Sequence, residues 1–447
     1  MKLSKYNIYV DLDDDDTLIY NCISGAMVKV GNSTYHELKC LNDYCKMETQ
    51  KVNIDSLEEF KKYNIILDDE FNEFDLIKAM HNVNKFRTKA DVMIYPTFDC
   101  IFNCPYCFIA KNRNPCGAPG GKMTEEIEKL VIEFTRDLVL NHDSIVLGWN
   151  GGEPMLTFDT VCRITKAIQK ITLDKGKEFK ASFLTNGYLL DKEKALEMRS
   201  CGINQVGISV DGPPEVHNMR RHLMNGEGTF DVILKNIKDI ADIFDVSLLT
   251  FLDRNNAGSF LKLLDIYKDE GLIGKVNVSC FSMQSCDLSS DIDENCFSRE
   301  EYAGILNDLR MEAAQRGVNI QQFPTQVWQG NCSGISMGSV AISPEGDLYK
   351  CRTLVGDKVN SAGNLKEKGW KSNPNIIKWL TFDLLKNNQC MECDILPICM
   401  GGCPLYEISP AVKDGSNNNC RLCPPIKYNI NEVLKFKYEH ILRRNAK

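Results

Sequence analysis

Long apolar runs and clustered basic residues are both missing from this 447-residue sequence. No apolar stretch approaches the roughly 18 residues that a transmembrane helix needs, and residues 1–16 lack the apolar core of a signal peptide. The net charge is −8 and no basic stretch stands out, which argues against nucleic acid as the main partner. We therefore expect a cytoplasmic protein with neither a membrane nor a nucleic acid as its partner.

Cysteine, in contrast, is abundant, with 20 residues. Because the cytoplasm works against structural disulfides, clustered cysteines in such a chain indicate metal ligation or catalysis. Eleven of them fall in two groups, at residues 100–107 and 332–423. The others are scattered, and we expect them to pack in the core, since free cysteine is among the most buried residue types.

The sequence pattern divides the chain into three parts, as its length suggests. Residues 1–88 read as a strand hairpin followed by short helices, which resembles a winged helix. Residues 89–317 repeat strand and helix six times, which predicts a parallel sheet curved into a partial (β/α)6 barrel like part of a TIM barrel. Residues 318–447 are loop-like and cysteine-rich and end in a helix. The predicted fold class is α/β.

The first cysteine group is Cys100, Cys104 and Cys107, spaced C-x₃-C-x₂-C directly after a strand-like run. Structural zinc takes four closed ligands, whereas the next cysteine here, Cys116, lies across a loop rich in glycine and proline. An iron–sulfur cluster held by three cysteines, with one iron open to a ligand, fits better. The position also suits catalysis, because chemistry in barrels gathers at the carboxyl ends of strands.

This spacing, with aromatic residues around it, closely resembles the cluster loop of radical S-adenosylmethionine (SAM) enzymes. Three later segments at predicted strand ends are similar to motifs of that family: GGEP at 151–154, TNG at 185–187, and S-x-D-G…H-x₃-R at 209–221. Each segment alone is an ordinary turn signal, but their order favours the family. The resemblance implies a SAM-binding 4Fe–4S cluster that cleaves SAM to a 5′-deoxyadenosyl radical, which then abstracts hydrogen from a substrate.

The resemblance also assigns roles to single residues. The three loop cysteines would be the catalytic cluster ligands. The SAM contacts would be Tyr106, Gly151, Gly152, Glu153, Thr185, Asn186, Ser209 and Arg221. The Glu153 carboxylate, or the backbone beside it, would receive the methionine ammonium. Arg221 would pair with the SAM carboxylate, since its fork binds both oxygens, and the spacing from His217 favours it over Arg220.

The second cysteine group resembles the SPASM domain, which carries two auxiliary 4Fe–4S clusters in radical SAM enzymes that modify peptides and proteins. Its pattern is a cysteine, G-x₄-C, C-x₂-C-x₅-C-x₃-C and two closing cysteines. The resemblance implies an outer cluster on Cys390, Cys393, Cys399 and Cys420. It implies an inner cluster on Cys332, Cys351 and Cys403. The three clusters together with SAM are the expected cofactors.

Two departures from the family bear on the chemistry. Some members supply a further inner cysteine where this chain has Gln326. The inner cluster either keeps an iron open for a substrate thiolate, which we favour, or recruits Cys423 or Cys296. Sulfatase-maturating members place an aspartate base after the G-x₄-C cysteine, where this chain has Arg352. That difference argues against sulfatase maturation.

Many SPASM enzymes that modify ribosomally made peptides begin with a winged-helix domain, so residues 1–88 would bind the leader of a precursor peptide. We expect a peptide maturase that forms a thioether between a cysteine sulfur and a carbon of another residue. Flavodoxin or ferredoxin would supply the low-potential electron. Carbon–carbon crosslinking and sulfatase maturation are the alternatives within the class, and a non-catalytic zinc scaffold is the alternative outside it.

Overall fold

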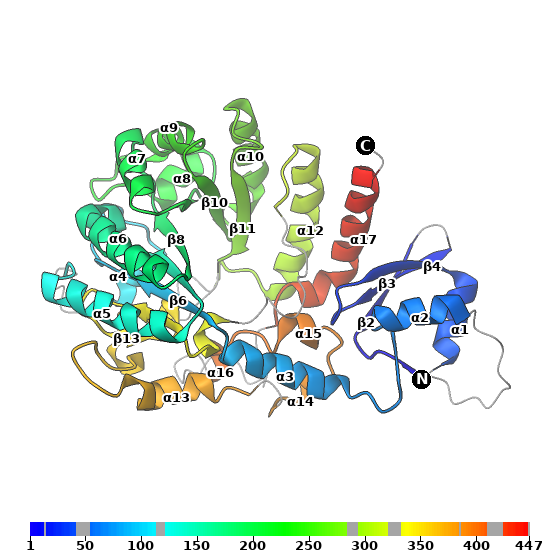
Figure 1. Cartoon of the computed structure of the whole chain (residues 1–447). Coiled ribbons are helices and arrows are strands. Elements are labelled where there is room, and N and C mark those ends of the chain that lie inside the picture. The colour runs from blue at the N-terminus through cyan, green and yellow to red at the C-terminus, as the bar shows by residue number, and fades with distance from the viewer. Residues whose placement is uncertain are drawn as a thin grey trace.

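Two sheets lie at opposite ends of the molecule (Figure 1). The computed structural model describes residues 1–12, 15–41, 54–112, 121–283, 294–320, 332–383, 386–408 and 423–445. In these residues the larger sheet has eight strands and the smaller has three. Helix α3 (Glu73–Lys85) runs between the two ends. No helix in the described ranges is long and apolar enough to cross a membrane.

Six parallel strands of the large sheet follow chain order, as the strand–helix repeats predicted. They are β6 (Lys89–Ile94), β7 (Ser144–Trp149), β8 (Glu178–Thr185), β9 (Gln205–Ser209), β10 (Asp245–Leu252) and β11 (Asn277–Ser282). The register aligns their carboxyl ends, with Ile94 opposite Trp149 and Trp149 opposite Phe183. Because β11 is an edge of the described sheet, the barrel is open.

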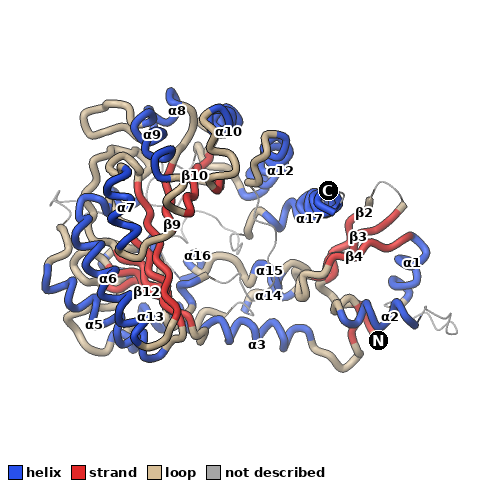
Figure 2. Tube along the Cα trace, turned by 45° about the horizontal axis from the view of Figure 1, so that its top comes forward, coloured by secondary structure: helices blue, strands red, loops and turns tan. Residues whose placement is uncertain are grey.

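Helices cover the outer face of this sheet (Figures 1 and 2). They are α5 (Glu125–Asn141), α6 (Phe158–Asp174), α7 (Lys192–Ser200), α8 (Pro214–Arg220), α9 (Phe230–Ile240) and α10 (Phe260–Asp269). Helix α12 (Arg299–Gln315) opens with a capping box between Ser298 and Glu301, which fixes its start. Alternate strand residues such as Ile145 and Leu147 are fully buried under the helices. Their neighbours Val146 and Gly148 therefore face the inside of the barrel.

The C-terminal part adds two strands to the barrel sheet, where the sequence predicted only loops. Strand β12 (Ser339–Ile342) pairs with β6 in parallel, and β13 (Leu348–Tyr349) pairs with β12 in the antiparallel sense. Both strands are fully buried. Strands this short carry almost no hydrophobic periodicity, which is why the sequence pattern did not reveal them. The remaining helices are α13 (Pro374–Leu380), α14 (Asn388–Met391), α15 (Leu396–Cys399), α16 (Leu405–Ile408) and α17 (Ile426–Asn445).

The N-terminal part contains a three-stranded antiparallel sheet instead of a simple hairpin. Its order is β2 (Asn7–Asp11), β3 (Asp16–Asn21) and β4 (Met27–Gly31). The predicted second strand is divided by a turn, in which the Asn21 side chain accepts hydrogen bonds from the backbone of Ile23 and Ser24. The other elements are β1 (Lys2–Leu3), α1 (Asn32–Cys40), α2 (Ile54–Lys62) and β5 (Ile66–Leu67). Helix α17 contacts β2.

The first and last parts of the chain share one apolar core. It joins residues of β2, β3 and α3 to residues of the cysteine-rich part. Its members include Ile8, Leu18, Tyr20, Ile77, Met80, Ile335, Phe382, Ile395, Leu396, Met400 and Leu434. The predicted boundaries at 88/89 and 317/318 fall between elements, but among the described residues one core joins the first and last parts and another joins the barrel to the last part.

Candidate functional site

The loop after β6 carries the first cysteine group and leads into α4 (Phe108–Asn112). The amide of Cys107 donates to the carbonyl of Cys104 at 3.2 Å, and the amide of Phe102 donates to Cys100 Sγ at 3.4 Å. Burial raises the pKa of the Cys100 thiol to about 12, and Glu153 and the other two thiols add to the increase. The structure therefore brings the three half-buried thiols together at the carboxyl end of β6.

Across the described ranges, no group of three His, Cys, Asp or Glu side chains is arranged to hold a single metal ion.

Two glycines hold this loop against the end of β7. The amide of Gly152 donates to the carbonyl of Thr97 at 3.0 Å, and the next amide, of Glu153, donates to the carbonyl of Asp99 at 2.7 Å. A Cβ on Gly152 would lie 2.2 Å from the Asp99 oxygen, and one on Gly151 would lie 2.6 Å from the Thr97 oxygen. Only glycine permits this approach. Glycine is required at both positions because the backbone of the cysteine loop lies so close to them.

The Glu153 side chain, which is completely buried, joins the ends of β7 and β8. Its Oε1 accepts from the amide of Met155 at 3.0 Å and from Thr185 Oγ1 at 2.8 Å. Its Oε2 accepts from the amide of Asn186 at 2.8 Å. Burial raises the pKa of this carboxyl, whereas the three hydrogen bonds oppose the increase. Asn186 Nδ2 lies 4.0 Å from Cys100 Sγ, so the TNG segment reaches the cysteine loop as well.

A polar network connects the cysteine loop with the end of β9. Arg221 Nη1 donates to the Tyr106 hydroxyl at 2.8 Å, and that hydroxyl donates to the Asp211 carboxylate. Burial alone would lower the pKa of Arg221, but Tyr106, Cys104 and Asp211 hold it well above its usual range. Ser209, half-buried, lies at the carboxyl end of β9 beside this network.

The two neighbouring arginines differ in their partners. Arg220 Nη1 donates to Asp253 at 2.8 Å, and its Nε lies 3.6 Å from Asp211. Arg221 is thus the one that hydrogen-bonds the cysteine loop. In these two arginines, three buried guanidinium nitrogens have no hydrogen-bond partner among the described residues: Arg221 Nε, Arg220 Nε and Arg220 Nη2. Unsatisfied buried donors of this kind are costly, and a bound carboxylate could accept from them.

His217 is a structural residue of this network. Its Nδ1 accepts from the amide of Asp211 at 3.3 Å, so its Nε2 carries the proton and donates to Thr229 Oγ1 at 3.1 Å. Thr229 Oγ1 in turn donates to the Arg221 carbonyl at 2.5 Å. Burial, and then the charges of Arg221 and Arg220, lower the pKa of His217 to about 3. The ring is therefore neutral and positions the backbone of Arg221.

The outer cysteines of the second group surround one cavity. Cys390, Cys393, Cys399 and Cys423 line it, together with Lys427. Lys427 Nζ donates to Cys423 Sγ at 3.5 Å. Burial raises the pKa of Cys399 to about 12, and the three other thiols add to the effect. Cys420, which the resemblance assigned here, lies outside the described residues, and Cys423 stands with the other three.

The inner cysteines gather near the first loop. Burial raises the pKa of Cys351 to about 12, and the thiols of Cys332 and Cys403 contribute. Cys351 and Cys403 pack against the same apolar cluster as Cys107, which places one member of the first group on the cluster that also contacts two inner cysteines. Of the two predicted candidates for a fourth inner ligand, Cys423 lines the outer cavity. Cys296 lies three residues before the start of α12.

Two site residues were missed by the sequence analysis. Asp211 lies inside the S-x-D-G segment, and the H-x₃-R part of the same motif, nine and ten residues further on, carries the arginines that it faces. Lys350 is buried, and burial lowers its pKa to about 7 although the Cys332 thiol opposes the shift. Nothing in the sequence indicates its burial, because that depends on the pairing of β12 with β6.

Residues 94–266 match the radical SAM superfamily. The match extends from the end of β6 into α10 and includes the cysteine loop and all three strand-end motifs. The chain carries a radical SAM domain. It is thus an enzyme of that superfamily, and the predicted α/β fold with a mostly parallel sheet is confirmed.

Two curated relatives cover most of the chain. The radical SAM cyclopropyl synthase TigE of Paramaledivibacter caminithermalis is 21% identical over 454 residues, covering 90% of this chain and 89% of TigE. The cysteine-type anaerobic sulfatase-maturating enzyme of Clostridium novyi is 25% identical over 341 residues, covering 72% of this chain and 89% of the relative. Both similarities extend well beyond the radical SAM domain.

Solved structures show the same fold. Native anSMEcpe with bound AdoMet and Kp18Cys peptide has a TM-score of 0.61 and 18% identity, covering 79% of this chain and 98% of that one. Streptococcus suis SuiB bound to the precursor peptide SuiA has a TM-score of 0.54 and 15% identity, covering 92% and 99%.

Gly152→Ala is expected to displace the cysteine loop, because its methyl group would meet the Asp99 and Phe98 oxygens at 2.2 and 2.4 Å. After anaerobic reconstitution the variant should lack about four iron atoms per chain, the content of one cluster, and its EPR spectrum should no longer respond to SAM. Gly258→Ala is the control, since no atom lies within 4 Å of that Cβ. Full iron content and an intact SAM response in Gly152→Ala would contradict this role.

His217 should make the fold sensitive to acid. Its pKa is about 3 in the folded state and about 6.5 in the unfolded state, so stability is complete above the unfolded value and is lost as pH falls below it. Between pH 7.5 and 5.5 the loss is about 1.4 kcal/mol. Thermal unfolding of His217→Gln should show a pH dependence that is smaller by this amount. His36→Gln, on the exposed α1, should behave like the parent protein. An equal pH dependence in His217→Gln and the parent would exclude the assignment.

Proposed function

We propose that this radical SAM enzyme acts on a ribosomally made precursor peptide and forms a thioether between a cysteine sulfur and a carbon of another residue. The observation that carries the proposal is that Cys107 of the first group packs against the same apolar cluster as Cys351 and Cys403. A substrate residue in the barrel would then lie between the radical source and the inner thiols. The solved relatives with a bound peptide and a bound precursor peptide support a peptide substrate.

SAM would bind at the carboxyl ends of β6 to β9. Held by the three loop thiolates, a 4Fe–4S cluster would supply the electron that splits SAM into methionine and a 5′-deoxyadenosyl radical. The unsatisfied nitrogens of Arg221 and Arg220 suit the SAM carboxylate. The Glu153 carboxylate already accepts three hydrogen bonds. The backbone beside it is therefore the better acceptor for the ammonium. Tyr106, Ser209 and the TNG segment would complete the pocket.

The second cysteine group would hold two auxiliary clusters. We assign Cys423, in place of Cys420, to the outer cluster, because it lines the cavity with Cys390, Cys393 and Cys399. That assignment removes Cys423 from the candidates for the inner cluster. The inner thiols Cys332, Cys351 and Cys403 would leave one position for the substrate cysteine. Such a position would orient the sulfur for bonding to carbon.

The leader peptide would bind at the free edge of the N-terminal sheet. Among the described strands, β4 has a single neighbour, β3, whereas α17 contacts β2 at the opposite edge. An extended peptide can add to such an edge as a further strand through backbone hydrogen bonds. The electron donor would be a flavodoxin or a ferredoxin.

Sulfatase maturation is a second candidate, favoured by the similarity to the Clostridium novyi enzyme. Arg352 follows Cys351, where the resemblance places an aspartate base. A guanidinium does not serve as a base near neutral pH, so we rank this candidate below thioether formation. Carbon–carbon crosslinking would differ from thioether formation only in the atom that bonds to the substrate carbon, which would be a carbon instead of a sulfur.

Co-expression with precursor peptides encoded beside this gene tests the proposal. Mass spectrometry should show the loss of two hydrogens per crosslink, and the crosslinked cysteine should resist iodoacetamide. A product that still alkylates would indicate a carbon–carbon bond, and formylglycine in a sulfatase-derived peptide would indicate the second candidate. Cys104→Ala should abolish the product, while Cys40→Ala, on the exposed α1, should retain it. Crosslinking by Cys104→Ala would refute the role of the loop.

The outer-cluster assignment can be tested by iron content. Cys423→Ser should destabilise or lose the outer cluster, with a loss of up to about four iron atoms per chain and an altered auxiliary EPR signal. Cys420→Ser, the matched control, should keep the full iron content and the unaltered auxiliary EPR signal. The opposite result would restore Cys420 as the ligand.

A further inference from the structure

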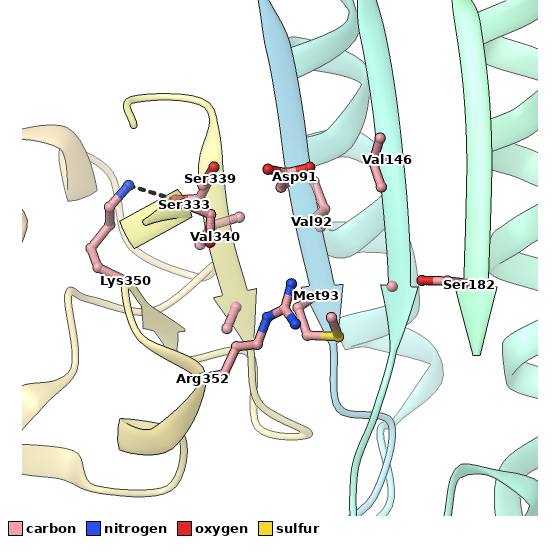
Figure 3. A pocket seen from close by; sticks show the side chains of 12 residues that line it. Asp91, Val92, Met93, Val146, Ser182, Ser333, Ser339, Val340, Lys350 and Arg352 are labelled. Atoms are coloured by element: carbon pink, nitrogen blue, oxygen red, sulfur yellow. Dashed lines mark hydrogen bonds between the residues drawn. The ribbon is translucent and has the colours of Figure 1, made fainter. Parts of the chain in front are cut away.

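A cavity of about 50 Å³ lies on the inner face of the large sheet (Figure 3). Residues of β6, β7, β8 and β12 form its wall, among them Met93, Gly148 and Ser182. Lys350 and Arg352 enter it from the segment that follows β13. One ordered water needs only about 10–15 Å³. The cavity therefore has room for a small polar group but not for an aromatic ring.

Two basic side chains, Lys350 and Arg352, line this cavity. Lys350 is buried, and its Nζ donates to the carbonyls of Ser336 and Ser339 at 2.5 and 2.6 Å. The acidic residue in the wall, Asp91, already pairs with Arg87 and, at 3.4 Å, with Lys89. Among the described residues that line the cavity, no acidic side chain is therefore left to pair with the Arg352 guanidinium.

Arg352 has a fixed backbone and an unpaired head group. Its carbonyl accepts from the Tyr95 hydroxyl at 3.4 Å and from the amide of Val355 at 3.3 Å. Its exposed side chain extends toward Met93 on β6 (Figure 3). Within the described ranges the guanidinium has no hydrogen-bond or ion-pair partner. The guanidinium is therefore available to bind an anion that enters the cavity.

We propose that Arg352 binds a carboxylate of the substrate in this cavity. A carboxylate matches both the guanidinium fork, which can donate two parallel hydrogen bonds, and its positive charge. Because Arg352 directly follows Cys351, the bound carboxylate would lie beside the inner thiols. This inference rests on the proposed function. The carboxylate would belong to an acidic side chain or to the C-terminus of the peptide, and it would lie close to the peptide residue that reacts.

Chemical modification of Arg352 tests whether this site binds a carboxylate, and it does not require the enzyme to turn over a substrate. Reconstituted enzyme is treated with phenylglyoxal, and mass spectrometry of the digest follows modification of Arg352. Acetate, as the carboxylate probe, should slow the modification by about twofold or more, whereas acetamide with sodium chloride at equal ionic strength should not. Arg136, exposed on α5, should react at the same rate in both. Equal protection of Arg352 by the two additives would overturn the proposal.

Precursor variants identify the source of the carboxylate. With wild-type enzyme, each Asp or Glu of a crosslinked precursor is changed to its amide, and the C-terminus is extended by one residue. One of these changes should lower the crosslinking yield by about tenfold or more, the effect expected for a lost charged hydrogen bond. If it is a side chain, lysine at that position should be tolerated by Arg352→Glu but not by Arg136→Glu.

The two claims fail in different ways. Full crosslinking yield with every acidic position neutralised and the C-terminus extended would overturn the carboxylate site and leave the proposed function standing. Acetate protection of Arg352 in an enzyme that crosslinks no precursor would support the carboxylate site and refute the proposed function.

Discussion

The close approach of Gly152 to the backbone of Asp99 is the constraint on which the candidate site depends. It fixes the path of the cysteine loop against the end of β7. The neighbouring Glu153 then fastens β7 to β8 from within the core. Three consecutive strand ends are thus joined by direct contacts within the protein. Contacts of this kind are what a site with demanding geometry requires.

The second feature that organises the molecule is the extension of the barrel sheet by β12. Because β12 pairs directly with β6, the segment that carries Cys351 and Arg352 is anchored beside the strand that leads into the first cysteine loop. The cavity beneath Arg352 exists only because these two distant parts of the chain form one wall. Peptide chemistry proposed for this enzyme therefore depends on a long-range strand pairing as much as on the motifs themselves.

The sequence was most informative where residues act locally. The six strands, the cysteine spacing and the strand-end motifs follow from patterns within short windows, and the structure reproduces the strands. The sequence did not predict the contacts that depend on tertiary packing. The burial of Lys350, the choice between Cys423 and Cys420 and the partner of Asp211 each depend on which distant segments meet. Local propensity carries no information about those meetings.

The core shared by the N-terminal sheet and the cysteine-rich part has a geometric consequence. Since β2 and β3 pack with residues such as Phe382 and Leu396, the sheet that contains the edge strand β4 is anchored on the cysteine-rich part of the chain. A peptide anchored on β4 would have to cross a constant span before its next segment entered the barrel. The number of residues between the segment bound to β4 and the reacting segment would then select the peptide residue that reacts.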